Sequence, residues 1–394
     1  MACIGGRGDT HVMKQHQAVD GTVAARRADC SPTSLVIQGR LARVGGQNIL
    51  FGSSGQAIFA INDTAADIWR SLEEGMPPEA ISFEIARGGI DRHEADRYVE
   101  AALDDWERLG LIRPRGPLSA PWAHVSQMVA IAGLHIRIVY PAACAFPAAT
   151  VFRHLEVQRE AADVVFHLAE HRGRIHLFRA GDWVQSCSPD ELPVMLKGHL
   201  LTEVLEHGAY ELAVHAAALL AGARVALVCG NPGAGKTTLT MALVHAGFGF
   251  AADDVTLLDS NGRCVGLPFA PAVKAGAWPL LAEYCPDLHA VPIFRRPDRR
   301  RVRFAVPRAF APHSPQSVGS VILLRRGHDA KACLEPVDPA SALRGLLNGA
   351  FAPGRELTGT AFNTLAKVIG SAQAYCLNYS SLDDAVELIA KACR

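Results

Sequence analysis

One short segment constrains the fold of this chain more than any other. Residues Gly230–Thr237 read GNPGAGKT and fit the pattern G-x-x-x-x-G-K-[ST]. An apolar run, Arg224–Cys229, precedes the segment, and a helical pattern, Thr238–His245, follows it. Glycines let the backbone wrap around phosphate oxygens, and a helix N-terminus places partial positive charge beneath the anion. The spacing therefore predicts a strand, a phosphate-binding loop (P-loop) and a helix within an α/β fold.

The loop assigns expected roles to its residues. Lys236 should reach the β- and γ-phosphates, and the Thr237 hydroxyl should bind Mg²⁺. The ligands that this pattern implies are ATP and Mg²⁺, and ATP against GTP stays open. The residues expected to hold the nucleotide in this loop are Gly230, Asn231, Pro232, Gly233, Ala234, Gly235, Lys236, Thr237 and Thr238.

Two adjacent acidic residues follow the loop closely. The apolar run Phe248–Ala252 ends at Asp253 and Asp254. At a strand end behind a phosphate-binding loop, one carboxylate can hold the metal and the other can accept a hydroxyl proton. A solvated Asp-Asp turn is the alternative, and the neighbouring loop favours the functional interpretation. Which aspartate is the base stays open.

Composition excludes several classes of protein. The 394 residues carry 39 basic and 39 acidic side chains, so a chain-wide binder of nucleic acid or of a membrane surface is not expected. No apolar run approaches roughly 18 residues, so no membrane span is expected either. The ten cysteines form no C-x-x-C pair, which favours free thiols in the reducing cytoplasm.

The chain divides into four predicted segments. Residues 1–33 are polar and are expected to be disordered, and the Pro-rich residues 114–125 are expected to be a linker. Residues 34–113 show short strands followed by three helices, an α+β module of winged-helix type. Asn62 and Asp63 are candidates to cap the first of these helices, and Asp91 is a candidate to cap the third. Residues 126–394 form the α/β domain that contains the P-loop.

The α/β domain resembles bacterial HPr kinase/phosphorylase. The resemblance rests on His215, on Gly230–Thr238 and on the AADDV segment Ala251–Val255. It implies a P-loop fold related to phosphoenolpyruvate carboxykinase and phosphoryl transfer from ATP to a serine hydroxyl. Carried over, His215 would lie near the transferred phosphate. Asp253 and Asp254 would share the base and metal roles.

Two features modify this resemblance. The E-I-R-G segment of HPr kinases is absent, and Gly266–Phe269 with Lys274 stands in that region, as in related kinases of peptides, including lasso-peptide precursors. HPr itself is therefore not the expected substrate, and Lys274 is a candidate phosphate contact. An arginine-rich stretch, Phe294–Phe304, is expected to be a solvated loop, from which Arg303 is the candidate to clamp phosphate.

The N-terminal module has a resemblance of its own. Asn62–Trp69 (NDTAADIW) and Leu109–Ile112 (LGLI) are similar to PqqD-like domains. Such domains bind leader peptides of ribosomally synthesised precursors, by strand addition and a groove beside a helix. Together, the two resemblances imply an ATP-dependent kinase of a serine hydroxyl in a precursor peptide, with the peptide as partner.

Two alternatives stay open. The P-loop could serve a nucleotide switch in a peptide chaperone or assembly factor that makes no phosphorylated product. The chain could also be a small-molecule kinase whose front module recruits a partner. A homo-oligomer is open as well.

One further motif matches a zinc-binding pattern. Residues His167–His171 (HLAEH) fit H-x-x-E-H, a zinc pattern when it lies on a helix. The segment Ala161–Glu170 is expected to be a surface helix without zinc.

Overall fold

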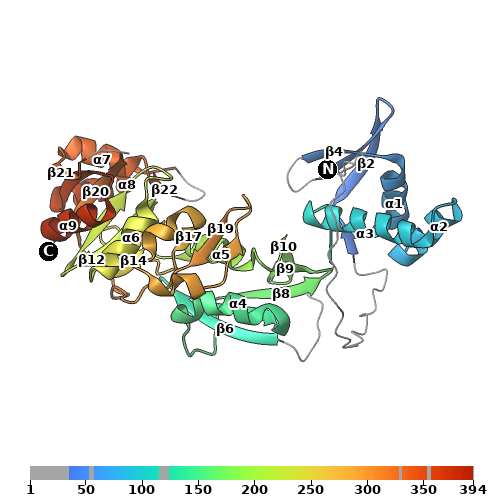
Figure 1. Cartoon of the computed structure of the whole chain (residues 1–394), viewed down its shortest axis with the longest axis horizontal. Coiled ribbons are helices and arrows are strands. Elements are labelled where there is room, and N and C mark those ends of the chain that lie inside the picture. The colour runs from blue at the N-terminus through green and yellow to red at the C-terminus, as the bar shows by residue number, and fades with distance from the viewer. Residues whose placement is uncertain (1–34, 53–56, 115–123, 328–330, 353–355, 394) are drawn as a thin grey trace. The chain divides into compact units, whose positions relative to one another are not determined.

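The computed structural model describes residues 35–52, 57–114, 124–327, 331–352 and 356–393 (Figure 1). The chain forms two units. The first consists of Met1–Ala120 and His167–Cys187, and the second of Pro121–Phe166 and Ser188–Arg394. The predicted disordered segment 1–33 and most of the predicted linker lie outside the described residues.

The first unit opens with short strands. β2 (Gly39–Val44), β3 (Gln47–Gly52) and β4 (Ala57–Ile61) form an antiparallel sheet in the order β2-β3-β4, so β4 lies at an edge of that sheet. β1 (Leu35–Ile37) pairs with β5 (Ile112–Pro114). β5 thus includes Pro114, the first residue of the predicted linker.

Three helices follow the strands, as the sequence predicts. They are α1 (Asp63–Glu73), α2 (Pro78–Arg87) and α3 (Arg92–Arg108). The Asn62 side chain accepts from the backbone N–H of Ala65, and Asp91 accepts from that of His93, so these two caps are confirmed. Asp63 is the first residue of α1 and not its cap. Trp69 and Trp106 meet edge to face, 5.0 Å between ring centroids, in the core of this unit.

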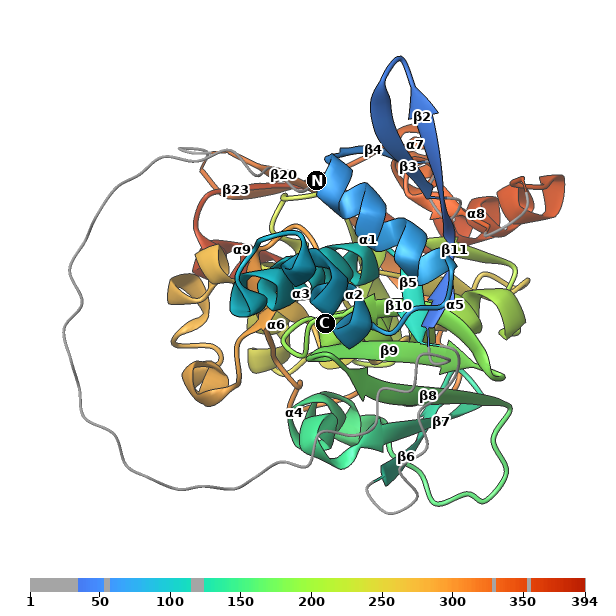
Figure 2. The same cartoon turned by 90° about the vertical axis from the view of Figure 1, so that its right-hand side faces the viewer.

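The first unit also contains a segment from later in the chain. β8 (Val164–His171), β9 (Arg174–Arg179) and β10 (Asp182–Cys187) are strands (Figure 2). The expected helix Ala161–Glu170 is therefore wrong. Buried and half-buried residues alternate along Val164–Leu168, which is the period of a strand and not of a helix.

The main sheet of the second unit has the order β14-β12-β13-β20-β23-β21. Its three central strands, β13 (Arg224–Cys229), β20 (Val318–Arg326) and β23 (Gln373–Tyr379), are parallel. β12 (Ala216–Ala221), β14 (Gly249–Ala252) and β21 (Cys333–Pro336) are antiparallel to their neighbours. A parallel centre brings the carboxyl ends of β13, β20 and β23 to one edge of the sheet.

Helices cover this sheet. α6 (Lys236–His245) and α9 (Leu382–Cys393) lie side by side and contribute Leu239, Leu243 and Ile389 to the core cluster of the sheet (Figure 1). α7 (Pro339–Leu347) and α8 (Gly359–Ser371) contact β20. The P-loop helix is thereby fixed by apolar packing along its length.

Smaller elements complete the second unit. β6 (His124–Ile131) and β7 (Leu134–Pro141) form a hairpin, and β6 begins within the predicted linker. The remaining strands form a sheet in the order β16-β15-β11-β22 and a sheet in the order β17-β19-β18. Their bounds are β11 (Leu212–Val214), β15 (Thr256–Leu258), β16 (Cys264–Val265), β17 (Ala272–Lys274), β18 (Phe294–Arg295), β19 (Arg301–Phe304) and β22 (Ala350–Phe351). The other helices are α4 (Ala142–Phe152), α5 (Leu192–His207) and the 3₁₀ turns Arg153–Leu155, Ala275–Ala277, Pro279–Leu281 and Pro286–Ala290.

The structure bears on the expectations about membrane spans and about cysteines. Among the residues that the structure describes, no helix has the length and apolar character needed to cross a bilayer. The cysteines within these residues are free thiols.

Candidate phosphate site and peptide groove

The P-loop joins β13 to α6 at the carboxyl edge of the parallel strands. Gly233 (φ +89°) and Gly235 (φ +93°) both have left-handed backbone conformations, which strain any residue with a Cβ. The helix starts at Lys236, with Gly235 as its N-cap. Strand, glycine loop and helix thus follow one another as the motif predicts.

Lys236 is held inside the loop. It is buried, and its Nζ donates to the Gly230 carbonyl at 2.8 Å. Burial lowers the pKa of this ammonium, and the Asp254 and Asp253 carboxylates oppose that shift. A desolvated cation at the mouth of the loop favours the binding of an anion there.

Asp253 follows β14 directly and reaches the loop. The Thr237 hydroxyl donates to Asp253 Oδ2 at 3.0 Å. Asp253 is 6% exposed, and its Oδ1 is buried without a hydrogen-bond partner among the described residues. Burial raises the pKa of this carboxyl to about 6, against the opposing effect of the Lys197 ammonium. Mg²⁺ prefers oxygen ligands, so the Thr237 hydroxyl and the free Asp253 oxygen fit this ion.

Asp254 lies on the solvent side of its neighbour. Its side chain is 62% exposed, and Oδ1 lies 3.5 Å from His215 Nε2. His215 comes from the junction of β11 and β12, where its backbone N–H donates to the Gly349 carbonyl. The structure therefore brings His215, Asp253, Asp254 and Thr237 together around the loop.

Of the other two predicted phosphate contacts, Lys274 lies near the P-loop lysine and Arg303 packs on an aromatic ring instead. Lys274, exposed at the end of β17, interacts electrostatically with Lys236. Arg303 on β19 lies over the Trp278 ring, 4.4 Å from its centroid. Arg303 therefore has a packing role against Trp278. No contact between Arg303 and the P-loop occurs in the described residues.

Most of the arginine-rich stretch is paired with acidic or aromatic neighbours. Arg295 contacts Asp190 at 3.0 Å, and Arg296 contacts Asp298 at 3.4 Å. Arg301 lies 5.7 Å from the Trp278 centroid. The expectation of a solvated loop is nevertheless wrong at both ends of the stretch, because β18 pairs with β19 and buries Phe294, Val302 and Phe304. Only the residues between the two strands form a mostly exposed turn.

Lys197 is a residue that the sequence analysis did not select. It lies on α5, donates from Nζ to the Ala270 carbonyl at 3.3 Å, and faces the Phe269 ring. It also interacts electrostatically with Asp253, Asp254 and Arg296, and burial lowers its pKa. No local motif marks this lysine, because it lies 39 residues before Lys236 in a largely apolar helix.

The first unit has a groove beside the edge strand β4. Its volume is about 580 Å³, and it lies between β4 and the helices α1 and α3. Apolar side chains line most of it, with a few polar groups at the rim. Its lining includes Phe59 and Ile61 of β4 and Tyr98, Ala101 and Ala102 of α3.

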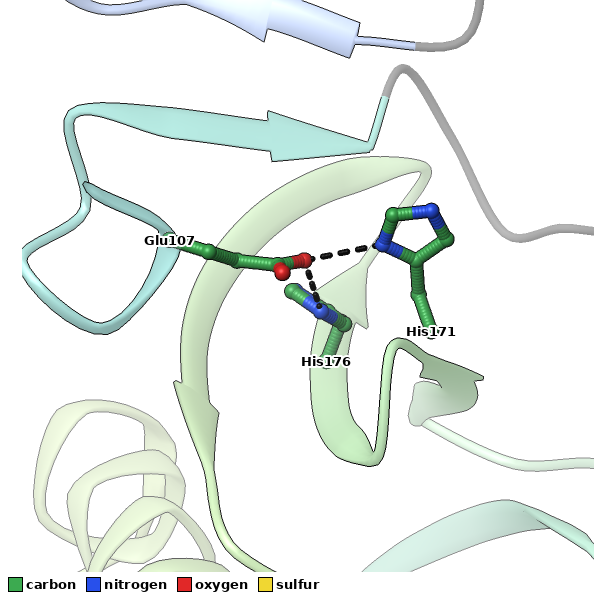
Figure 3. Close-up of side chains that lie close together, drawn as sticks. All are labelled: Glu107, His171 and His176. Carbon is green, nitrogen blue, oxygen red and sulfur yellow. Dashed lines mark hydrogen bonds and ion pairs between the residues drawn. The ribbon is translucent and has the colours of Figure 1, made fainter. Parts of the chain in front are cut away.

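A second cluster of titratable residues in the first unit is distinct from both sites. Figure 3 shows Glu107 of α3 pointing at two histidines of the β8–β9 hairpin. Glu107 Oε1 lies 2.9 Å from His171 Nδ1 and 2.8 Å from His176 Nε2. Arg172 Nε is 3.9 Å from the other oxygen. Burial alone would raise the pKa of Glu107, but the two histidines hold it at about 2.

Three such ligands could hold a metal ion, but a hydrogen bond from Trp183 argues otherwise. Trp183 Nε1, which can only donate, lies 3.2 Å from His176 Nδ1. His176 Nδ1 is therefore the acceptor of this bond, so the ring proton sits on Nε2, which faces Glu107. A nitrogen that carries a proton has no lone pair for a metal. The cluster is thus a hydrogen-bonded clamp between α3 and the hairpin.

We expect Glu107→Gln to reduce stability at pH 7 and to flatten its pH dependence. The folded pKa of about 2 lies below the unfolded value of 4.5, so this carboxylate stabilises the fold above pH 4.5. That contribution, roughly 3 kcal/mol at most at 1.36 kcal/mol per pKa unit, is lost as the pH falls from 4.5 to 2. Urea unfolding at pH 7 and pH 3.5, with Glu100→Gln on the exposed side of α3 as control, tests this. Equal pH slopes in wild type and Glu107→Gln would exclude the clamp.

Asp253→Asn is expected to stabilise the ligand-free protein at neutral pH. The folded pKa of about 6 exceeds the unfolded value of 3.8. Ionisation of Asp253 therefore opposes folding when the pH is above 3.8, and the full penalty is present above pH 6. Asparagine removes up to about 3 kcal/mol of that penalty at pH 8, and the gain should vanish near pH 4. Unfolding midpoints at both pH values measure it, with the exposed neighbour Asp254→Asn as control. A destabilised Asp253→Asn at pH 8 would contradict the burial argument.

One known family matches part of the first unit. Residues 47–112 match the family described as coenzyme PQQ synthesis protein D (PqqD), so the first unit holds a PqqD domain. No curated protein matches the chain.

Solved structures similar to this chain are of two kinds. A lasso peptide synthetase B1 complexed with the leader peptide is 20% identical over 21% of this chain and all of its own, with a TM-score of 0.20. TbiB1 in complex with the TbiA(β) leader peptide is 22% identical, over 21% and 95% of the two chains, with a TM-score of 0.19. The Hpr(Ser) kinase/phosphatase from Coxiella burnetii is 16% identical, over 46% and 95%, with a TM-score of 0.23. Both resemblances drawn from the sequence thus reappear among the comparisons.

Proposed function

We propose that this protein is an ATP- and Mg²⁺-dependent kinase that phosphorylates a serine hydroxyl of a ribosomally synthesised precursor peptide. One observation carries the proposal: the P-loop and the aspartate pair share one site, where Thr237 donates to the buried Asp253. A P-loop with a carboxylate beside its Thr binds nucleotide and metal, and a second carboxylate adds a base.

The position and exposure of each side chain indicate its role in the reaction. Loop N–H groups and the Lys236 ammonium bind the β- and γ-phosphates. Thr237 and Asp253 hold Mg²⁺, which when bound neutralises charge on the phosphate oxygens. Asp254, exposed and 3.5 Å from His215, is the carboxylate that an incoming hydroxyl can reach. We assign Asp254 as the base and His215 as the group that orients it.

The phosphoryl transfer forms one bond to the γ-phosphorus and breaks another. The serine hydroxyl gives its proton to the Asp254 carboxylate, and its oxygen forms a bond to the γ-phosphorus. The bond from that phosphorus to the β,γ-bridging oxygen breaks, and ADP leaves. Lys197 adds a cation beside the two aspartates and limits the mutual repulsion between these carboxylates and the phosphates.

The first unit supplies peptide binding in this proposal. β4 has a free edge, and the groove between β4 and α3 lies directly beside it. An extended leader can add a strand to β4 and place apolar side chains in the groove. Binding the leader raises the effective concentration of the acceptor serine at the kinase site.

The experiment uses γ-labelled ATP, Mg²⁺ and the low-mass peptide fraction of the host. Wild type should label a small peptide, and Asp254→Asn should not. ATP hydrolysis without a labelled peptide would favour the nucleotide switch instead. Label on a metabolite would favour the small-molecule kinase.

A further inference from the structure

The P-loop is held from behind by a side chain that lies 143 residues after Lys236. Tyr379 ends β23, is 3% exposed, and donates from its hydroxyl to the Ala234 carbonyl at 3.1 Å. Neighbouring loop carbonyls are satisfied locally: Gly230 by Lys236, Asn231 by the Ala234 N–H, and Gly235 by the Leu239 N–H. The Ala234 carbonyl instead takes its partner from another strand of the sheet.

That bond fixes one peptide plane. In a trans peptide the C=O and the following N–H point in opposite directions. Because the Ala234 carbonyl points into the core toward Tyr379, the Gly235 N–H points out of the loop, toward the phosphate side. With the opposite orientation of this plane, a carbonyl oxygen would face the phosphates, and the loop would repel them.

The fit behind the loop is close. A Cβ built on Gly235 would lie 2.7 Å from the Tyr379 hydroxyl and 3.9 Å from its Cζ. Arg326, the register partner of Tyr379 on β20, has Nη1 3.9 Å from the same point. Glycine at 235 is therefore required twice, by its φ of +93° and by the tyrosine behind it.

We propose that Tyr379 is a positioning residue that orients the Ala234–Gly235 peptide for binding of the nucleotide phosphates. The inference rests on the proposed function only in that the loop binds nucleotide. Burial raises the pKa of the phenol, so the hydroxyl stays protonated and keeps donating near neutral pH.

The test measures binding of ADP with Mg²⁺ by titration calorimetry, and unfolding midpoints without ligand. Tyr379→Phe keeps the ring and removes the bond, and we expect ADP to bind roughly five- to tenfold more weakly, the value of one hydrogen bond. Tyr375→Phe is the matched control on the same strand, since its hydroxyl donates to the side chain of exposed Gln373. It should bind as wild type does.

A double-substitution cycle separates positioning from general stability. Gly235→Ala should weaken ADP binding more in wild type than in the Tyr379→Phe background, because phenylalanine removes the atom 2.7 Å from the new Cβ. Additive effects, or a Tyr379→Phe protein with a lower unfolding midpoint and unchanged ADP affinity, would overturn the inference. Wild type that binds no nucleotide would instead contradict the proposed function.

Discussion

Replacing Lys236 by alanine should reduce phosphoryl transfer at least about a thousandfold while the protein stays folded. Catalysis in such a site consists of positioning and charge neutralisation, and this lysine supplies both at the β- and γ-phosphates. Its ammonium is buried and has the Gly230 carbonyl as its hydrogen-bond partner, so its loss removes a desolvation penalty and little packing. Stability should therefore change little or increase.

Initial rates of peptide labelling and thermal unfolding measure the two halves of this prediction. Lys367→Ala is the matched control, because Lys367 is exposed and also donates from Nζ to a carbonyl, that of Ser260. It should leave the rate within twofold of wild type. A Lys236→Ala protein that still transfers phosphate at a tenth of the normal rate would exclude the loop as the catalytic site.

The strand–loop–helix geometry of the proposed phosphate site could be predicted from the sequence because it is local. A strand, a loop of six residues (230–235) and a helix start are contiguous, and their backbone geometry is required by the motif itself. Asp253 and Asp254 follow from the next strand, since β14 ends beside the loop. Each of these inferences spans fewer than about 30 residues, the length of one strand–helix–strand unit.

The supporting residues could not be predicted, because the sheet order brings them in. β13 and β23 lie on either side of β20 in the sheet, and this strand order places Tyr379 within reach of Ala234. Nothing in the sequence near Tyr379 indicates that order. Lys197 lies near the aspartates on a helix whose largely apolar sequence gives no sign of a functional lysine. Arg303 shows the converse, because its guanidinium stacks on Trp278, a partner 25 residues away that no motif predicted.

The histidine motif failed for a related reason. H-x-x-E-H has meaning on a helix, where its two histidines share a face. The segment is a strand, and there His171 joins His176 of the next strand and Glu107 of a distant helix. The pairing of sequence-distant segments, and not the motif, decided which titratable groups meet.

Filling the groove of the first unit should separate leader recognition from catalysis. Ala102 lines the groove from α3, beside Ala101 and Tyr98. Ala102→Trp should occupy much of its volume of about 580 Å³ and block an added strand on β4. We expect the KM for the labelled peptide to rise at least about a hundredfold with kcat nearly unchanged, because the leader's binding energy and the effective concentration it provides are lost together.

His93→Trp adds the same side chain to an exposed position of α3 outside the groove and should change neither constant. The same peptide without its N-terminal half should be a poor substrate for wild type and for Ala102→Trp alike, because neither can bind a leader that is absent. A loss of kcat in Ala102→Trp, with KM unchanged, would mean that this unit acts on the reaction itself. Equal kinetics of wild type and Ala102→Trp on the full peptide would mean that the groove beside β4 does not bind the leader. The kinase site would then have to select its serine unaided, from the residues around Asp254 and His215 alone.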